Sequence, residues 1–328
     1  MKKFLLLVGL FALIACQKET KSSDAFTESS GLINNVSIII DNGLWNSEVG
    51  DTIRYKLAAE VEGLPMSEPL FSLNQYPENI FKGFMKNSRN IVIVKRGENK
   101  GFSATVNQFA NPQNVFYLLA STNEGIVALL EKNADSIINT IKRTEILEKQ
   151  KRIKKSLLSE GKLINTFGLS LKIPSAYQYA MEKDKFFWIK KEIPSGNSSL
   201  LIYEVPIHKI EKDTALTCNI TTLRDSIGKL YVHGPLQNTY MVTEDAYAPY
   251  FYKTHLDSKP TYLTKGVWEL KNDFMAGPFV NYAIKDEKNN RFIIIEGFVY
   301  APSKEKRDLV QELEAIISSA TFKQKKIK

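Results

Sequence analysis

The sequence predicts an α+β protein, a two-part α/β sandwich whose halves differ in their pattern of apolar residues. Apolar residues make up 43% of the 328 residues and aromatic residues 11%, which indicates a packed core and excludes a disordered or fibrous chain. The first half alternates strand-like and helix-like segments. The second half consists of short alternating strands, which favour a mainly antiparallel sheet packed by a C-terminal helix.

In the first half, an apolar run at 36–40 predicts a buried strand, and the β-branched run at 91–94 predicts a central one. Between them, four apolar residues recur at every fourth position and predict a helix: Trp45, Val49, Ile53 and Leu57. Leu64-Pro65 ends this helix. An extended piece at 70–73 and a short helix then lead to the second strand.

The longest predicted helix begins at a capping box formed by Ser121 and Glu124. Apolar residues at helical spacing continue it to about Ser159, and Gly161 is expected to stop it. Its end is strongly basic, since seven basic and only two acidic residues lie in the segment 142–155. We expect this basic end to link the two halves.

The second half contains a series of predicted strands, at 169–173, 186–190, 200–205, 240–243, 249–256 and 262–270. The clearest hairpin joins 279–284 to 291–300 through a turn at 286–290. Ser303 is expected to cap a closing helix, whose apolar side chains share one face and should pack on the sheet.

Residues 1–15 have the pattern of a secretory signal peptide. Lys2 and Lys3 precede twelve mostly apolar residues, too few to cross a membrane as a helix. The segment ends in Leu13-Ile14-Ala15-Cys16, which resembles a lipobox, the pattern read by bacterial lipoprotein-processing enzymes. The resemblance implies cleavage before Cys16 and acyl chains on its sulfur, which would anchor the protein in a membrane. An ordinary signal peptide with an incidental cysteine is the alternative.

Residues 16–30 are polar and rich in Ser and Thr, which predicts a flexible linker after the lipidated residue. We therefore expect a signal peptide at 1–15, this linker at 16–30, an N-terminal α/β domain at 31–160 that ends in the basic helix, and a C-terminal antiparallel α+β domain at 161–328. Gln17 after the cysteine resembles lipoproteins sorted to the outer membrane. The periplasmic and the surface-exposed face both stay open.

Several longer motifs resemble a domain-of-unknown-function family of Bacteroidota lipoproteins over residues 31–319. They are Leu64-Pro65, Glu68-Pro69-Leu70-Phe71, Arg89-Asn90-Ile91, Asn272-Asp273-Phe274-Met275, Gly277-Pro278-Phe279-Val280 and Gly297-Phe298-Val299-Tyr300-Ala301-Pro302. Met66-Ser67 and Ala276 depart from the family's pattern. The second half also resembles PsbP-like domains, at 169–174 and 316–322, which implies a sheet backed by helices and a binding or scaffolding module.

The usual signatures of enzymes are missing from the sequence: the Gly-x-Ser-x-Gly elbow, the His-Glu-x-x-His zinc helix, the P-loop and the Gly-x-Gly-x-x-Gly turn. We therefore assign no catalytic residue, cofactor or metal ligand. His208, His233 and His255 are far apart and have no close cluster of acids or cysteines beside them. Cys218 is expected to be a buried small hydrophobe, with a catalytic thiol as the alternative.

Tyrosines gather in one stretch of the second half, where Tyr250, Tyr252 and Tyr262 form a candidate face for a sugar, peptide or lipid headgroup. Packing in the core is the other interpretation. Four Asp-Ser/Thr-apolar triplets resemble the Bacteroidota O-glycosylation signal. They imply modification at Thr52, Ser136, Thr214 or Ser226, with turn or cap chemistry as the alternative.

The formal net charge of +8 arises largely from the basic segment 142–155. Aromatic residues are not interleaved there as in single-strand binders, so we expect no nucleic-acid partner. The leading hypothesis is a membrane-anchored, non-enzymatic binding or assembly module whose partner is an envelope protein, a glycan or an anionic lipid. An envelope enzyme acting on glycan or lipid is the second hypothesis.

Overall fold

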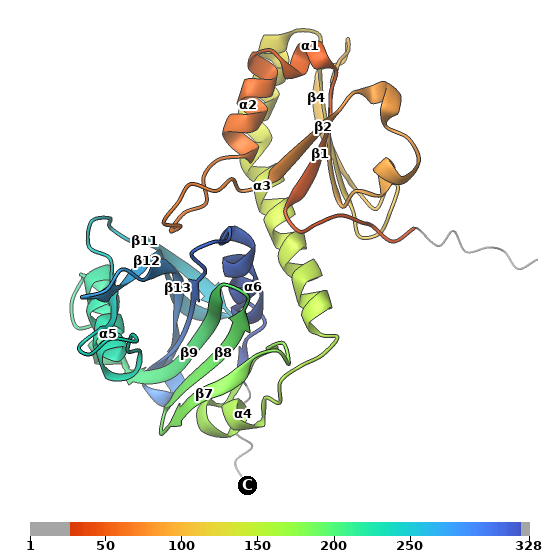
Figure 1. The fold of residues 1–328 in the computed structure, drawn as a ribbon. Coiled ribbons are helices and arrows are strands. Elements are labelled where there is room, and N and C mark those ends of the chain that lie inside the picture. Colours follow the sequence, from red (N-terminus) through yellow and green to blue (C-terminus); the bar gives the residue numbers. More distant parts are fainter. Residues whose placement is uncertain (1–26, 323–328) are drawn as a thin grey trace, which may run out of the picture.

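The structure, a computed structural model, describes residues 27–322. The predicted signal peptide, Cys16 and most of the predicted linker lie outside the described residues. The fold is α+β, as the sequence predicts, with a mixed, mostly parallel sheet in the N-terminal half and a curved antiparallel sheet in the C-terminal half (Figure 1). None of the helices within 27–322 is long and apolar enough to cross a membrane.

The N-terminal half contains a five-stranded sheet in the order β2-β1-β3-β5-β4, parallel except for β4. Its strands are β1 (Asn35–Ile39), β2 (Ser72–Tyr76), β3 (Asn90–Arg96), β4 (Gly101–Val106) and β5 (Asn114–Ala120). The runs at 36–40 and 91–94 are therefore strands, as predicted. The β4–β5 hairpin was not predicted from the sequence, although β5 lies inside the sheet between β3 and β4.

Helices α1 (Asn42–Trp45), α2 (Glu48–Leu57) and α3 (Asn123–Ile153) belong to the N-terminal half, and α2 and α3 pack on one face of the sheet. Gly50 lies inside α2, although glycine costs about 1 kcal/mol there relative to alanine. A Cβ atom at this position would lie 1.9 Å from the carbonyl oxygen of Trp45, so the tight α1–α2 corner requires glycine.

Both predicted ends of the long helix were wrong. Thr122, not Ser121, is the N-cap, and its side chain accepts a hydrogen bond from the Gly125 amide. The helix ends at Ile153 rather than near Ser159. Gly161 does not stop it but begins a separate helix, α4 (Gly161–Phe167), because the intervening segment turns and pairs Leu157 with Pro174.

The C-terminal half contains an eight-stranded antiparallel sheet in the order β10-β12-β13-β14-β9-β8-β7, with β11 also paired to β12. Its strands are β7 (Gln178–Lys183), β8 (Phe186–Ile193), β9 (Gly196–Pro206), β10 (Tyr240–Thr243), β11 (Tyr250–Leu256), β12 (Lys259–Lys271), β13 (Ala276–Asp286) and β14 (Arg291–Tyr300). β6 (Leu169–Ser170) and β15 (Thr321–Phe322) form a separate pair. The predicted hairpin is β13–β14.

Helices cover both faces of this sheet. α5 (Leu216–Tyr231) packs on one face, and α4 and α6 (Arg307–Ile317) pack on the other. Because β13 and β14 are buried on both faces of the sheet, their sequences are nearly continuous runs of apolar residues. α5 was not predicted from the sequence. α6 is the predicted closing helix and packs on β13 and β14.

Ser303 does not cap α6, contrary to the prediction. The cap comes from the other half of the chain, where the buried Glu68 carboxylate accepts hydrogen bonds from the backbone amides of Lys306 and Arg307, each at 2.8 Å. A carboxylate at a helix N-terminus is favoured by the unpaired amides and the helix dipole. Arg307 in turn donates to the Pro69 carbonyl, 2.9 Å away.

A buried polar cluster fixes α3 to both halves. The Glu145 carboxylate, fully buried on α3, pairs with Arg89 at 2.7 Å and accepts hydrogen bonds from the Asn90 side chain and the Asn34 amide. The Asn34 side-chain amide exchanges hydrogen bonds of 2.9 and 3.0 Å with that of Gln311 on α6. The cluster therefore connects the N-terminal sheet, α3 and α6.

Replacing Glu145 by alanine would leave the Arg89 guanidinium buried without its counter-charge. We expect Glu145→Ala to lower the free energy of unfolding by about 3 to 5 kcal/mol. Glu131→Ala on the same helix removes an exposed pair with Lys56 and should cost at most about 1 kcal/mol. Urea denaturation followed by far-ultraviolet circular dichroism measures both. Equal, small losses in the two variants would contradict the structural role of Glu145.

Candidate functional site

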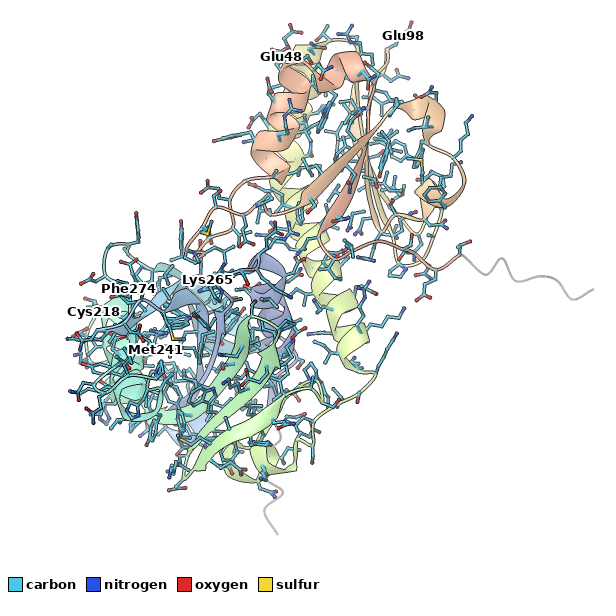
Figure 2. The ribbon with its side chains drawn as sticks, viewed as in Figure 1. Glu48, Glu98, Cys218, Met241, Lys265 and Phe274 are labelled. Atoms are coloured by element: carbon cyan, nitrogen blue, oxygen red, sulfur yellow. The ribbon has the colours of Figure 1, made fainter. Side chains whose placement is uncertain are left out.

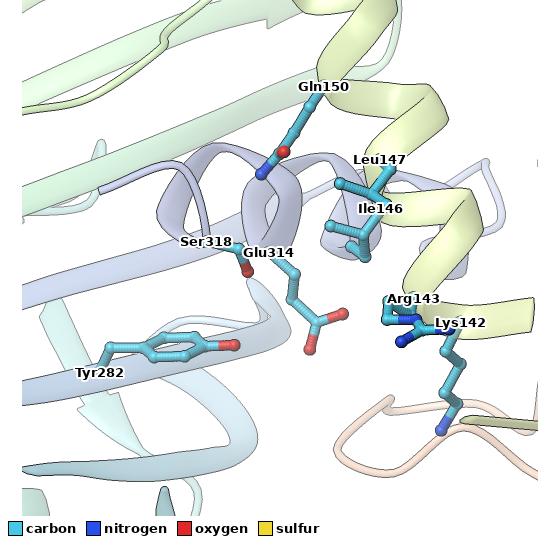
Figure 3. Close-up of a pocket in the computed structure, with 8 residues that line it drawn as sticks. All are labelled: Lys142, Arg143, Ile146, Leu147, Gln150, Tyr282, Glu314 and Ser318. Atoms are coloured by element: carbon cyan, nitrogen blue, oxygen red, sulfur yellow. The ribbon is translucent and has the colours of Figure 1, made fainter. Parts of the chain in front are cut away.

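The leading candidate site is a groove in the seam between the two halves, with a cavity volume of about 370 Å³. Figure 3 shows α3 forming one wall and α6 with β13 forming the other. Eight residues line it: Lys142, Arg143, Ile146, Leu147, Gln150, Tyr282, Glu314 and Ser318. We call it the seam groove.

Helical spacing explains how α3 supplies one whole wall of the seam groove. Lys142, Ile146 and Gln150 follow at four-residue steps, so their side chains lie on one face of the helix. The Gln150 side-chain amide donates a hydrogen bond of 2.9 Å to the Ala315 carbonyl on α6. This contact, together with the Glu145 cluster, holds the two walls at a fixed separation.

The opposite wall is polar and partly charged. Tyr282 on β13 points its hydroxyl into the seam groove near Glu314 (Figure 3). Burial raises the pKa of the Tyr282 hydroxyl, and the Glu314 charge raises it further. Glu314 also pairs with Lys265 at 2.8 Å. Burial disfavours the Lys265 ammonium, but Glu314 outweighs that effect, so the pKa of Lys265 is raised.

Lys142 and Arg143 both line the seam groove, and among the described residues no carboxylate lies within 4.0 Å of either cation. Lys142 is an exposed residue, yet its pKa is lowered. Removal of water around the ammonium is the main cause, and the neighbouring charge of Lys265 adds to it. Ile146 and Leu147 provide an apolar strip beside this cation. The groove thus suits a small ligand with an apolar body and an anionic or hydrogen-bonding head.

A second, smaller pocket of about 240 Å³ lies on the face of the N-terminal sheet opposite α2 and α3. Ile39, Ile93 and Tyr117 lie side by side on β1, β3 and β5 and form its floor. Phe81 and Phe109 pack edge to face above them, and the Lys86 ammonium lies 5.2 Å from the Phe109 ring centre. The Lys86 ammonium therefore already forms the cation–π contact that these aromatic rings offer.

The profile of a domain of unknown function, DUF4837, matches residues 156–319, half of the chain. The chain belongs to the DUF4837 family. The profile of a second domain of unknown function, DUF8532, matches residues 29–154. The expected membership of a domain-of-unknown-function family is thereby confirmed. No curated protein matches the sequence.

Two solved structures are similar to part of this DUF4837 protein. The Ran-binding protein Mog1p of Saccharomyces cerevisiae is 10% identical and covers 47% of this chain and 90% of its own, with a TM-score of 0.32. The human StarD13 (DLC2) lipid transfer and protein localization domain is 9% identical and covers 44% of this chain and 88% of its own, with a TM-score of 0.22. Scores this low carry no argument about function.

The structure separates the three tyrosines of the predicted ligand face. Tyr250 and Tyr252 lie on one side of β11 and are partly exposed. The Tyr252 hydroxyl donates to the Glu62 carboxylate at 2.8 Å, and its pKa is raised to about 12 by burial and by Glu62. Tyr262 lies opposite Lys253 in the strand pairing, which puts it on the other side of the sheet. There its hydroxyl donates to Glu211 at 2.7 Å.

Cys218 is exposed on α5, so the expectation of a buried residue was wrong. The buried face of α5 carries Asn219, Ile220 and Arg224, and Cys218 lies outside it. Figure 2 shows Cys218 on the outer side of the molecule and Met241 farther inside. His208, His233 and His255 are all exposed, and within 27–322 no three His, Cys, Asp or Glu side chains are placed to hold a metal ion.

The four residues of the predicted glycosylation triplets differ in their setting. Thr52, Ser136 and Ser226 lie in α2, α3 and α5, and Thr214 lies just before α5. Thr52 and Ser226 donate hydrogen bonds to backbone carbonyls four residues earlier, as such residues commonly do in helices. Modification of these residues stays a prediction.

Sequence reasoning missed a buried ion pair beneath α5. The Arg224 guanidinium Nε lies 2.9 Å from the Glu296 carboxylate, and both side chains are almost fully buried. Asn281 donates a hydrogen bond of 2.9 Å to the same carboxylate. Burial raises the pKa of Glu296 despite the charge of Arg224. One feature of the sequence could have indicated this ion pair: Glu296 lies in the middle of the mostly apolar strand 291–300.

The lowered pKa of Lys142 predicts unusual reactivity. Near pH 9 a larger fraction of its amine is neutral, so acetic anhydride should acetylate it faster than Lys285, whose pKa is raised by hydrogen bonding to Glu211. The same shift affects stability. Between the lowered pKa of Lys142 in the folded chain and its ordinary pKa in the unfolded chain, the unfolded chain binds more protons, so the free energy of unfolding rises with pH in that range. Peptide mass spectrometry after timed labelling measures the two rates. Slower labelling of Lys142 than of Lys285 would contradict this description of the site.

Proposed function

We propose that this DUF4837 protein is a lipid-anchored binding module of the bacterial cell envelope that holds a small ligand in the seam groove. The observation that carries the proposal is the lining of the groove. An apolar strip, an uncompensated lysine and several hydrogen-bonding groups converge in a cavity of about 370 Å³ between walls that buried polar contacts hold in place. Cavities of this kind and size are typical ligand sites.

The anchor rests on the sequence. Leu13-Ile14-Ala15-Cys16 ends a short apolar segment, and two or three acyl chains on one cysteine bind a bilayer far more tightly than one. Gln17 after the cysteine favours the outer membrane, and the longer motifs favour a Bacteroidota lipoprotein. The second hypothesis, an envelope enzyme acting on glycan or lipid, has less support, because each histidine is exposed and lies in a different part of the C-terminal half.

The anchor is tested by lipid labelling. Cells that express the protein are given radiolabelled palmitate, and we expect label in the wild-type chain and none in Cys16→Ala, because only Cys16 supplies the sulfur for the acyl chains. Cys218→Ala is the matched control and should retain the label. Equal labelling of Cys16→Ala and the wild type, or none in either, would refute the lipid anchor.

The ligand site is tested by filling it. Ser318 is an exposed residue at the seam groove, so Ser318→Trp should occupy the cavity without disturbing the core. Anilinonaphthalene sulfonate, an apolar anion, serves as the probe. We expect its dissociation constant to rise at least about tenfold in Ser318→Trp, since a blocked cavity removes most of the contact.

The control for this titration is Thr222→Trp, which adds the same ring at an exposed position on α5. It should bind the probe as the wild type does. Mass spectrometry of small molecules that co-purify with the protein from host membranes gives a second readout, in which Ser318→Trp should lose a species that Thr222→Trp keeps. Unchanged probe binding in Ser318→Trp would rule out the seam groove as the site.

A further inference from the structure

The C-terminal half of α3 carries an exposed stripe of side chains that begins at the mouth of the seam groove. Arg143, Leu147, Lys151 and Lys154 follow at steps of four, four and three residues, so they lie in one row along the helix. All four are exposed. Figure 1 shows this part of α3 with α6 on one side and no other element on the opposite side. We call this row the α3 stripe.

The positive charge of the α3 stripe is largely uncompensated. Glu145 is buried and pairs with Arg89 on the opposite side of the helix, and Glu148 pairs with Arg152. Within residues 27–322, the one carboxylate that pairs with the stripe is Glu28, which lies 2.8 Å from the Lys151 ammonium. Both partners are exposed, so water and salt weaken this pair.

An apolar residue lies in the middle of these cations. Leu147 is 56% exposed, between Arg143 and Lys151 on the same face. Leu157, which follows the helix, is also exposed. A helix face that combines basic residues with an exposed leucine is typical of segments that lie on an anionic bilayer, where the cations meet headgroups and the leucine enters the boundary with the acyl chains.

The start of the folded chain lies beside the same stripe. Glu28 pairs with Lys151, and ten residues, 17–26, separate Cys16 from the first described residue. Eleven residue steps span at most about 40 Å even when fully extended. A lipid on Cys16 would therefore keep residue 27, next to the Lys151 end of the α3 stripe, within that distance of the bilayer surface.

We propose that the α3 stripe is the membrane-facing surface of this protein and contacts the anionic headgroups of a lipid bilayer. The proposal rests on the lipid anchor for its cellular setting, but the contact itself needs no acyl chain. Arg143 and Leu147 also line the seam groove, so this orientation turns the mouth of the groove toward the headgroup layer.

The test uses the mature chain from residue 16 with Cys16→Ser, so that no lipid contributes, and measures co-sedimentation with vesicles. Wild-type binding to phosphatidylcholine vesicles containing roughly one third phosphatidylglycerol should be strong at low salt and fall at high salt. Arg143→Glu, Lys151→Glu and Lys154→Glu combined should lower the partition coefficient at least about tenfold. Leu147→Ser alone should lower it about two- to fivefold.

The matched control combines Lys183→Glu, Lys253→Glu and Lys288→Glu, exposed lysines of the C-terminal half, and changes the net charge equally. It should bind vesicles within about twofold of the wild type. Thermal unfolding checks that each variant is folded. Equal losses in both triple variants, salt-independent binding, or binding to soluble heparin without vesicle binding would overturn the proposal. Failure of palmitate labelling at Cys16 would remove the anchor alone, because this assay contains no lipidated protein.

Discussion

A buried carboxylate on the long helix is the interaction on which the arrangement of this molecule depends. Glu145 is fully buried, and a charge in that environment is stable only if nearby groups compensate it. Arg89, Asn90 and the Asn34 amide do so from the N-terminal half. Because Asn34 also bonds to Gln311 on α6, one polar cluster sets where the helix runs relative to both sheets.

A second carboxylate strengthens the same seam. Glu68 belongs to the N-terminal half but caps α6, which packs on the C-terminal sheet. Glu68 thus accepts hydrogen bonds directly across the boundary, whereas Glu145 acts through Asn34, whose side chain bonds to Gln311. Gln150, which lines the seam groove, also bonds to the Ala315 carbonyl on α6, so hydrogen bonds between the two walls set the width of the groove. Its Lys142 and Tyr282 are brought together although they come from different halves.

The C-terminal sheet uses a comparable device beneath α5. Arg224 reaches from the helix to Glu296 and packs over the Phe279 ring at 4.0 Å. An apolar core tolerates many arrangements, whereas a buried ion pair is stable in few. This pair fixes α5 on its face of the sheet, while α6 on the other face carries Glu314 into the seam groove.

Local sequence pattern by itself determined the α+β class, the strands at 36–40 and 91–94, the β13–β14 hairpin and the basic end of α3. Periodicity and turn residues act over a few neighbours, so they can be read from the chain directly. The ends of α3, the cap of α6, the exposure of Cys218 and the separation of Tyr262 from Tyr252 were decided by the tertiary structure. Each depends on partners distant in sequence, such as Glu68 for α6 and Glu211 for Tyr262, and no local pattern records them.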